Sequence, residues 1–240
     1  MDVAALFSGG KDSTYAVYLA LKRGLNIKFL LTVFPREGSW YFHHPCIELT
    51  KIQAKLMGIK QVRLKGRRLG EEERKDLERL IRKVKDKVDA IICGVIASNF
   101  QKKRIKTVCD EYDLKLITPL WKKDRYETLL KQIEEGFEII VTGVASDGFN
   151  KEWLGRKLDW NTINELLYLS KKFGVDIAGE GGEYETLVLD CPIFSGRIVL
   201  REIEKIWDSK TNSGFIKIKR FDIIEKPGCR NQVQRAGLER

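Results

Sequence analysis

The chain has 240 residues, of which 43% are hydrophobic and 32% charged, with a net charge of +10 at pH 7. This composition fits a globular protein with a sizeable core and excludes a low-complexity chain. No apolar run approaches the roughly 20 residues that a membrane span needs, and the N-terminus has no basic signal-peptide segment, so we expect a cytoplasmic protein without membrane contact. The five cysteines are scattered without a CxxC pair, which argues against a disulfide framework or a zinc site.

Short apolar runs alternate with helical patterns over the first 145 residues. The expected strands are 3–7, 27–34, 61–64, 90–93, 116–117 and 138–144. The expected helices are 13–23, 45–57, 70–87, 98–112 and 124–135. Alternating strands and helices predict crossover units, and so an α/β fold with a doubly wound parallel sheet of the five-stranded type.

The pattern changes after residue 145. We expect a helix over 161–173 and strands over 186–189, 196–207 and 214–224, the last two joined as a hairpin by residues 208–213. The sequence thus predicts a first domain over 1–145, a smaller α+β domain over 146–225, and a basic tail over 226–240.

A phosphate-binding loop is indicated by ALFSGGKDST at residues 5–14, where an expected strand passes into an expected helix. Amides at a helix N-terminus hold anions, and glycines let the backbone approach them closely. A Walker A loop is excluded because Ala5 and Asp12 stand where it needs glycine and Ser or Thr. No G-x-G-x-x-G dinucleotide fingerprint occurs here either.

The segment Ser8-Gly9-Gly10-Lys11-Asp12-Ser13 resembles the SGGxDS pyrophosphate-binding loop of the N-type ATP pyrophosphatases, the PP-loop superfamily. In that superfamily the loop holds the β and γ phosphates of ATP, and attack on the α-phosphorus gives an adenylate. The resemblance implies ATP as co-substrate and Mg²⁺ as cofactor. It also implies that all six residues bind ATP, with catalytic roles for Lys11 and Asp12 and with Asp12 as the metal ligand.

Five further segments resemble the diphthine–ammonia ligases of archaea and eukaryotes: LLTVFPREGSWYFHHP, GVIASNFQKKR, PLWKKD, SDGFNKEWLGRKLD and GEGGEYETLVLDCPIF. The resemblance covers residues 1 to about 200 and is most specific at 180–186, whereas His44 and Cys46 depart from the family pattern. It implies an adenine nucleotide α-hydrolase-like (HUP) first domain that binds ATP and a second domain that binds the acceptor.

This family carries out the last step of diphthamide synthesis. The carboxylate of diphthine on elongation factor 2 attacks ATP, pyrophosphate leaves, and ammonia displaces AMP from the acyl-adenylate. Free ammonium is the expected nitrogen donor because the chain has no room for a glutaminase domain. The resemblance argues against direct nucleic-acid binding, and a homodimer is compatible with the sequence.

Residues that follow the expected strands are candidates for the rest of the ATP site, because ligands lie beyond the carboxyl ends of parallel strands. Ser98, Gln101 and Arg104 share one side of a helix after the 90–93 strand. The candidates are Thr32, Val33, Phe34, Gly94, Ser98, Gln101 and Arg104, of which Arg104 is expected to act near the α-phosphate or the acceptor.

The acceptor site is expected around an acidic segment, where Glu180, Glu183, Glu185 and Asp190 are so close that a cation, a helix end or solvent must offset their repulsion. The quaternary ammonium of diphthine could supply that cation, with Tyr184, Trp153 and Trp160 as candidates for cation–π contact. Glu183 or Glu185 could deprotonate ammonium. The candidate acceptor residues are His43, Ser146, Asp147, Trp153, Gly155, Arg156, Gly181, Gly182, Glu183, Tyr184, Glu185 and Thr186.

Two other functions stay open at this point. A tRNA-modifying adenylating enzyme would suit the net charge of +10 through phosphate contacts, although the unpaired cysteines disfavour a thiolase. A non-catalytic ATP sensor would need the phosphate loop but no acceptor segment. The acidic segment itself could also be a solvated turn.

Overall fold

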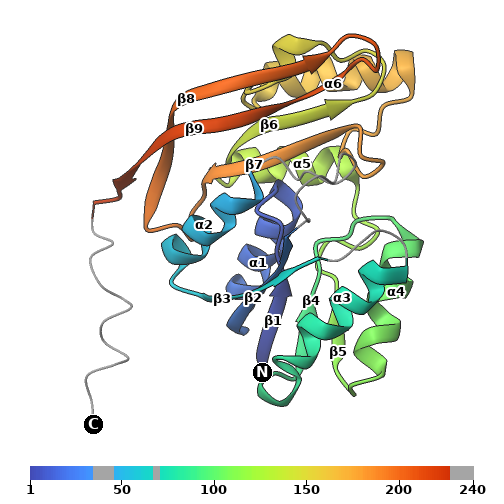
Figure 1. Ribbon diagram of the computed structural model, residues 1–240, viewed down its shortest axis with the longest axis vertical. Helices are drawn as coiled ribbons and strands as arrows, with labels where there is room; N and C mark the ends of the chain where they lie inside the picture. The colour runs from blue at the N-terminus through green and yellow to red at the C-terminus, as the bar shows by residue number, and fades with distance from the viewer. Residues whose placement is uncertain (35–45, 67–70, 228–240) are drawn as a thin grey trace.

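The computed structural model describes residues 1–34, 46–66 and 71–227 (Figure 1). Its first sheet has five strands in the order β3-β2-β1-β4-β5, and all of its strand pairs are parallel. The strands are β1 (Asp2–Leu6), β2 (Asn26–Phe34), β3 (Lys60–Lys65), β4 (Ala90–Ile92) and β5 (Lys115–Ile117). The order reverses between β1 and β4, so the predicted doubly wound α/β sheet is confirmed.

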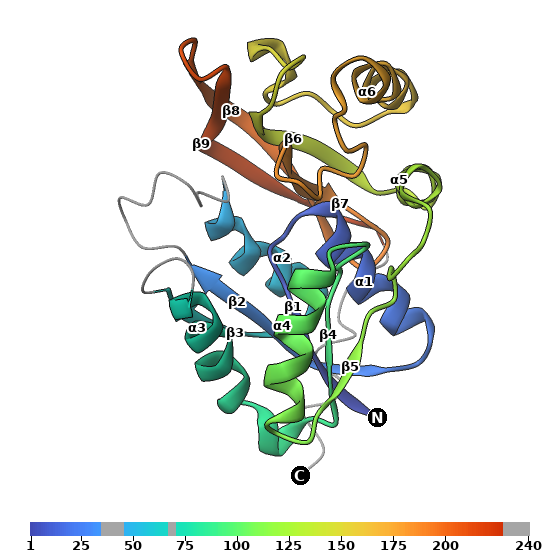
Figure 2. The ribbon, with the colours of Figure 1, turned by 90° about the vertical axis from the view of Figure 1, so that its right-hand side faces the viewer.

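Helices cover both faces of the parallel sheet (Figure 2). They are α1 (Lys11–Lys22) and α2 (Thr50–Met57) on one face, and α3 (Glu71–Arg82) and α4 (Asn99–Asp110) on the other. The first pair buries small side chains such as Ala16, Ala20 and Ala54, whereas the second pair buries Leu80 and Val108. Short 3₁₀ helices occur at Ile47–Leu49, Lys85–Lys87 and Lys151–Trp153.

The second sheet has four strands in the order β7-β6-β9-β8, and its strand pairs are antiparallel. The elements of this part are α5 (Arg125–Glu134), β6 (Glu138–Ala145), α6 (Trp160–Phe173), β7 (Tyr184–Asp190), β8 (Gly196–Asp208) and β9 (Ser213–Glu225). The predicted hairpin is confirmed as β8 and β9.

The prediction that residues 138–144 belong to the parallel sheet is wrong. This strand, β6, pairs antiparallel with β7 and β9. A buried strand has the same apolar pattern in either kind of sheet, so periodicity alone could not assign it. The division of the chain into domains at residue 145 stays a prediction.

Helix α1 lies between the two sheets (Figure 2). Ala16 and Ala20 on one side of the helix join the core of the parallel sheet. On another side, Tyr15 and Tyr18 meet Phe137 edge-on, with ring centroids 5.4 Å and 5.5 Å apart, in the core of the second sheet. The helix that follows the phosphate loop is therefore fixed from both sides.

Two expectations concern segments outside the described residues, namely the start of a helix at Pro45 and most of the basic tail. Across the described ranges, no helix combines the length and apolar character that a bilayer crossing requires.

Strand β4 and helix α1 approach each other most closely at Gly94. A Cβ atom there would lie 2.6 Å from the backbone oxygen of Asp12 and 2.9 Å from the backbone nitrogen of Ser13. Backbone atoms of a helix cannot rotate away as a side chain can. The close approach of the two elements at the cavity described below therefore requires glycine at this position.

Gly94→Ala is expected to lower the free energy of unfolding by about 3 kcal/mol, because the backbone of α1 must shift to admit the methyl group. Urea unfolding would measure this loss. Gly174→Ala is the matched control: Gly174 has a φ of 73° with nothing within 4 Å of an added Cβ, so alanine there costs only about 1 kcal/mol of left-handed strain. If the two variants lost equal free energies of unfolding, the close approach of Gly94 to the backbone of α1 would be contradicted.

Candidate active site

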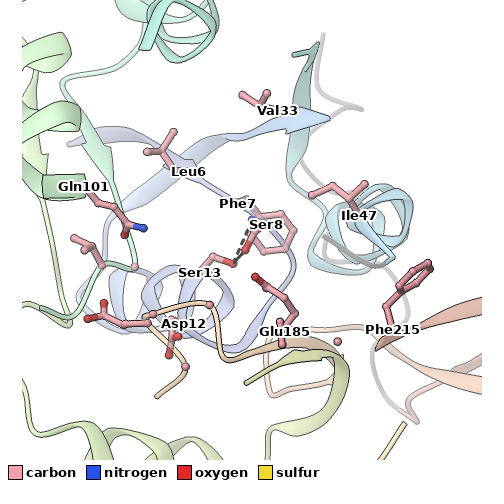
Figure 3. Close-up of a pocket in the computed structure, with 18 of the residues that line it drawn as sticks. Leu6, Phe7, Ser8, Asp12, Ser13, Val33, Ile47, Gln101, Glu185 and Phe215 are labelled. Carbon is pink, nitrogen blue, oxygen red and sulfur yellow. Dashed lines mark hydrogen bonds between the residues drawn. The ribbon is translucent and has the colours of Figure 1, made fainter. Parts of the chain in front are cut away.

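A cavity of about 1650 Å³ lies between the carboxyl edge of the parallel sheet and the second sheet. Ser8, Val33 and Gly94 line it from the ends of strands of the first sheet, and Glu185 and Phe215 line it from the second (Figure 3). The strand order reverses between β1 and β4, and doubly wound sheets bind ligands at the point of such a reversal. The cavity is therefore the candidate active site.

Residues 8–13 join β1 to α1 at this cavity. Gly9 has a φ of 81°, and a Cβ atom there would lie 2.4 Å from Gln53 Oε1. Ser8 and Ser13 both line the cavity, with their hydroxyl oxygens 3.1 Å apart (Figure 3). Two hydroxyl donors at the start of a helix form a suitable site for an anion.

The loop is held on its other side by β7. Gly9 O accepts from Val188 N at 3.1 Å and from Gln53 Nε2 at 3.0 Å. Lys11 N donates to Thr186 Oγ1 at 3.1 Å. The structure thus places Thr186, expected at the acceptor, behind the phosphate loop.

Lys11 is buried, with 4% of its surface exposed. Its ammonium donates to Asp12 Oδ2 at 2.6 Å and to Ala178 O, and lies 5.4 Å from the centre of the Tyr184 ring. Burial alone would lower the pKa of Lys11, but Asp12 and other neighbours outweigh it and hold the pKa above its ordinary value. Lys11 therefore stays charged at neutral pH, and in this structure it joins the loop to residue 178 rather than lining the cavity.

Asp12 lines the cavity and has both carboxylate oxygens engaged by the protein. Oδ1 accepts from Gln132 Nε2 at 3.1 Å, while Oδ2 accepts from Lys11. Gln132 is fully buried on α5, and its Oε1 has no hydrogen-bond partner among the described residues. Two groups from different elements therefore fix the orientation of this carboxylate.

The site fits Mg²⁺ better than a metal held by protein ligands alone. Within the described ranges, no three His, Cys, Asp or Glu side chains are arranged to hold a metal. Mg²⁺ keeps several waters and binds through one or two carboxylates together with substrate phosphates. One oriented carboxylate beside a phosphate loop meets that requirement.

The turn between β4 and α4 forms a second wall. Gly94, Gln101 and Arg104, three of the candidates for the ATP site, line the cavity. Ser98 is instead the N-cap of α4, because its Oγ accepts from the backbone nitrogen of Gln101 at 3.3 Å. A serine between a strand and a helix often caps the helix, and Ser98 has this structural role.

Glu180 reaches the same turn from the second part of the chain. Its carboxylate accepts from the backbone nitrogens of Ile96 at 2.6 Å and Ala97 at 2.8 Å. Arg125 lies 4.0 Å from the same carboxylate and 3.3 Å from Asp176. The repulsion expected in the acidic segment is thus offset in part by amides and cations of the chain itself.

Three candidates lie at the end of β2, namely Thr32, Val33 and Phe34. Within the described part of the chain, Val33 alone of these three lines the cavity. Thr32 is buried and donates its hydroxyl to Phe7 O at 2.8 Å. Phe34 O accepts from Gly66 N at 2.7 Å. The backbone oxygen of Phe34 and the hydroxyl of Thr32 therefore already hold the strand in place.

The segment at 180–186 is split between the cavity and the core. Gly181, Gly182 and Glu185 line the cavity. Glu183 lies behind them, where its Oε1 accepts from Asp176 N at 3.1 Å. Tyr184 is buried and donates its hydroxyl to Ile177 O at 2.7 Å. Of the two candidate bases, the structure brings Glu185 to the cavity.

The structure does not bring the remaining acceptor candidates to the described cavity wall. Trp153 is buried, and its ring faces the guanidinium of Arg156 at 4.8 Å. Arg156 in turn pairs with Glu165, a hydrogen bond that raises the pKa of Arg156. Ser146, Asp147 and Gly155 lie in the same region beyond β6, Trp160 is exposed at the start of α6, and His43 falls outside the described residues.

Sequence reasoning missed several residues at the site, among them Gln53, Gln132, Ile206 and Phe215. The two glutamines hold loop residues through single amide groups, and nothing in their helical patterns distinguishes them from surface residues. Ile206 and Phe215 belong to alternating strand patterns, and only the pairing of the strands decides which side of each strand meets the cavity.

Comparison with known proteins assigns the chain to a family. The model of the diphthamide synthase N-terminal domain matches residues 1–116, and that of the C-terminal domain matches residues 125–224. The mouse diphthine–ammonia ligase is 31% identical, with 94% of each chain aligned. The chain belongs to the diphthamide synthase family.

Two further comparisons differ in how much of each protein they cover. The fission yeast (Schizosaccharomyces pombe) diphthine–ammonia ligase is 34% identical over 91% of this chain, but the aligned part is only 39% of that relative's length. A solved structure, a predicted subunit of tRNA methyltransferase from Methanocaldococcus jannaschii, is 20% identical over 80% of this chain and 98% of its own, with a TM-score of 0.44.

In this diphthamide synthase family member, Lys11→Met is expected to lower the free energy of unfolding by about 2–4 kcal/mol. The substitution leaves Asp12 without its buried cation and Ala178 O without its donor. Urea unfolding would measure the loss. Lys22→Met is the matched control, because Lys22 pairs with Glu135 at an exposed position, where such a pair is worth about 0–1 kcal/mol. Unchanged stability of Lys11→Met would show that the link to residue 178 is unimportant.

Proposed function

We propose that the chain is an ATP-dependent diphthine–ammonia ligase that acts on elongation factor 2. The observation that carries the proposal is the SGGKDS loop at the floor of a large cavity whose other wall belongs to the second sheet. One cavity can then hold ATP on one side and a protein-borne carboxylate on the other. Membership of the diphthamide synthase family supports this choice of acceptor.

The reaction divides into two transfers. In the first, a carboxylate oxygen of diphthine forms a bond to the α-phosphorus of ATP, and the bond from that phosphorus to the bridging oxygen breaks, so that pyrophosphate leaves. In the second, the nitrogen of ammonia attacks the acyl carbon, and AMP leaves with the former carboxylate oxygen. The protein must hold two anions together in the first step and remove protons from ammonium in the second.

Residues of the phosphate loop are suited to the leaving group. The hydroxyls of Ser8 and Ser13 supply donors at the start of α1, and Arg104 of α4 supplies positive charge to the same cavity. Asp12 would hold Mg²⁺, which neutralises phosphate charge when bound. Lys11 and Gln132 would act through Asp12, because they orient its carboxylate.

Glu185 is the better placed of the two candidate bases. It lines the cavity, whereas Glu183 is not among the residues that line it. Figure 3 shows the Glu185 side chain pointing from β7 toward Ser13. A carboxylate there can receive a proton from ammonium bound between the two sheets.

The direct test is pyrophosphate release from ATP with Mg²⁺ and ammonium, with diphthine-bearing elongation factor 2 present or absent. We expect release that depends on the factor, together with the mass change on the factor that accompanies conversion of a carboxylic acid to its amide. Mass spectrometry of the factor reports the second result. Release that depends on tRNA instead of the factor would overturn the proposal in favour of a tRNA-modifying enzyme.

Asp12→Asn is expected to raise the Mg²⁺ concentration that gives half-maximal ATP binding by about 10-fold or more, because an amide is a weaker ligand for Mg²⁺ than a carboxylate. Calorimetric titration of ATP at several Mg²⁺ concentrations would measure it. Asp147→Asn is the matched control, since Asp147 is exposed and outside the cavity lining. An unchanged Mg²⁺ requirement in Asp12→Asn would remove Asp12 from the metal site.

A further inference from the structure

Four residues of the second sheet form one row across it. Glu185 of β7 stands opposite Gly143 of β6, Gly143 stands opposite Phe215 of β9, and Phe215 stands opposite Ile206 of β8. All four line the cavity. Because directly opposite residues of antiparallel strands point to the same face, the three side chains of this row share one face of the sheet.

That face is the one turned toward the phosphate loop. The neighbouring residues Tyr184 and Ile216 have the opposite parity along their strands, and both are buried in the core on the other face. Figure 3 shows Glu185 and Phe215 pointing to the same side, toward Ser13 and Ile47. Glycine at the middle position leaves the carboxylate and the ring separated by two strand spacings, about 10 Å between Cα atoms.

The wall formed by this row is suited to a cation that carries apolar groups. Phe215 and Ile206 supply apolar surface, and Glu185 supplies negative charge on the same face, two strands from Phe215. Asp208 lies in the next row, opposite Ser213, and also lines the cavity. A backbone hydrogen bond from Lys210 lowers the pKa of Asp208, which favours the charged form of this carboxyl group.

The opposite wall carries hydrogen-bond donors and positive charge, which suit an anion. It contains the serine hydroxyls of the phosphate loop, the start of α1 and Arg104. An acceptor that carries both an anionic and a cationic group would be oriented between the two walls, with its carboxylate toward the nucleotide and its cation toward the second sheet.

We propose that Phe215, flanked by Ile206 and by the carboxylates of Glu185 and Asp208, binds the quaternary ammonium group of the acceptor. The inference rests on the proposed function, in which the acceptor is diphthine. A quaternary ammonium donates no hydrogen bonds, so an aromatic face and nearby negative charge are the groups that recognise it. The site would make the enzyme selective for the trimethylated acceptor over its unmethylated precursor.

The aromatic residues suggested by the sequence are less suited to this role. Two of these residues are Tyr184 and Trp153. Both rings are buried on the core side of the second sheet. Phe215 is half-buried and lies on the cavity side.

The test compares Phe215→Leu, which keeps apolar surface but removes the ring, with Phe215→Tyr, which keeps the ring. We expect Phe215→Leu to raise the KM for trimethylated elongation factor 2 by about 3- to 30-fold, the range that corresponds to a cation–π contact, with the KM for ATP unchanged. Phe215→Tyr should retain the wild-type KM. Ile223→Leu, an exposed position of the same strand outside the cavity lining, is the control for general effects on β9.

A binding measurement separates this inference from the proposed function. Choline and its neutral analogue 3,3-dimethylbutan-1-ol have nearly the same shape and differ in charge, so NMR titration of each into the full chain with bound ATP needs no turnover. We expect choline to bind, the alcohol to bind more weakly, and Phe215→Leu to lose the difference. Choline binding that Phe215→Leu leaves unchanged would overturn the inference even if the enzyme amidates elongation factor 2. Choline binding at Phe215 without any amidation would instead count against the proposed acceptor alone.

Discussion

The hydrogen bonds between the phosphate loop and β7 are the contacts on which the geometry of the site depends. Gly9 O accepts from Val188 N, and Lys11 N donates to Thr186 Oγ1. The ammonium of Lys11 extends the same link to Ala178 O. A loop that belongs to the parallel sheet by sequence is therefore held in shape by the second sheet. Neither part of the chain forms the complete site without the other.

This arrangement explains why polar groups are buried where the two sheets meet. Lys11, Gln53 and Gln132 are all buried, and a buried polar group is costly unless it is hydrogen-bonded. Each of them donates to an atom of the loop or of the segment that faces it. Apolar residues at these positions would leave Asp12 without its two donors and Gly9 O with Val188 N alone. These hydrogen bonds fix the conformation of the loop, and this offsets the cost of removing the polar side chains from water.

Much of the fold followed from the sequence because local patterns determine it. The parallel strands, their helices, the hairpin and the SGGKDS loop were all indicated by periodicity and by glycines at a strand–helix junction. The sequence did not indicate the sheet to which β6 belongs, because a buried strand has the same apolar pattern in a parallel and an antiparallel sheet. Lys11 illustrates the same limit at the site: its charge was evident, but whether that charge meets phosphate or Asp12 depends on where residue 178 lies.

The two walls of the cavity follow from two different rules of protein structure. The phosphate side arises from the reversal of strand order between β1 and β4, which opens a crevice at the carboxyl ends of the strands and places the start of α1 there. The other side arises from strand register, which turns Glu185, Phe215 and Ile206 toward the crevice. It turns Tyr184 and Ile216 toward the core. A shift of β9 by one residue would exchange Phe215 for Gly214 or Ile216 on the cavity face. The character of the second-sheet wall is thus a property of strand pairing, whereas that of the opposite wall is a property of the loop sequence.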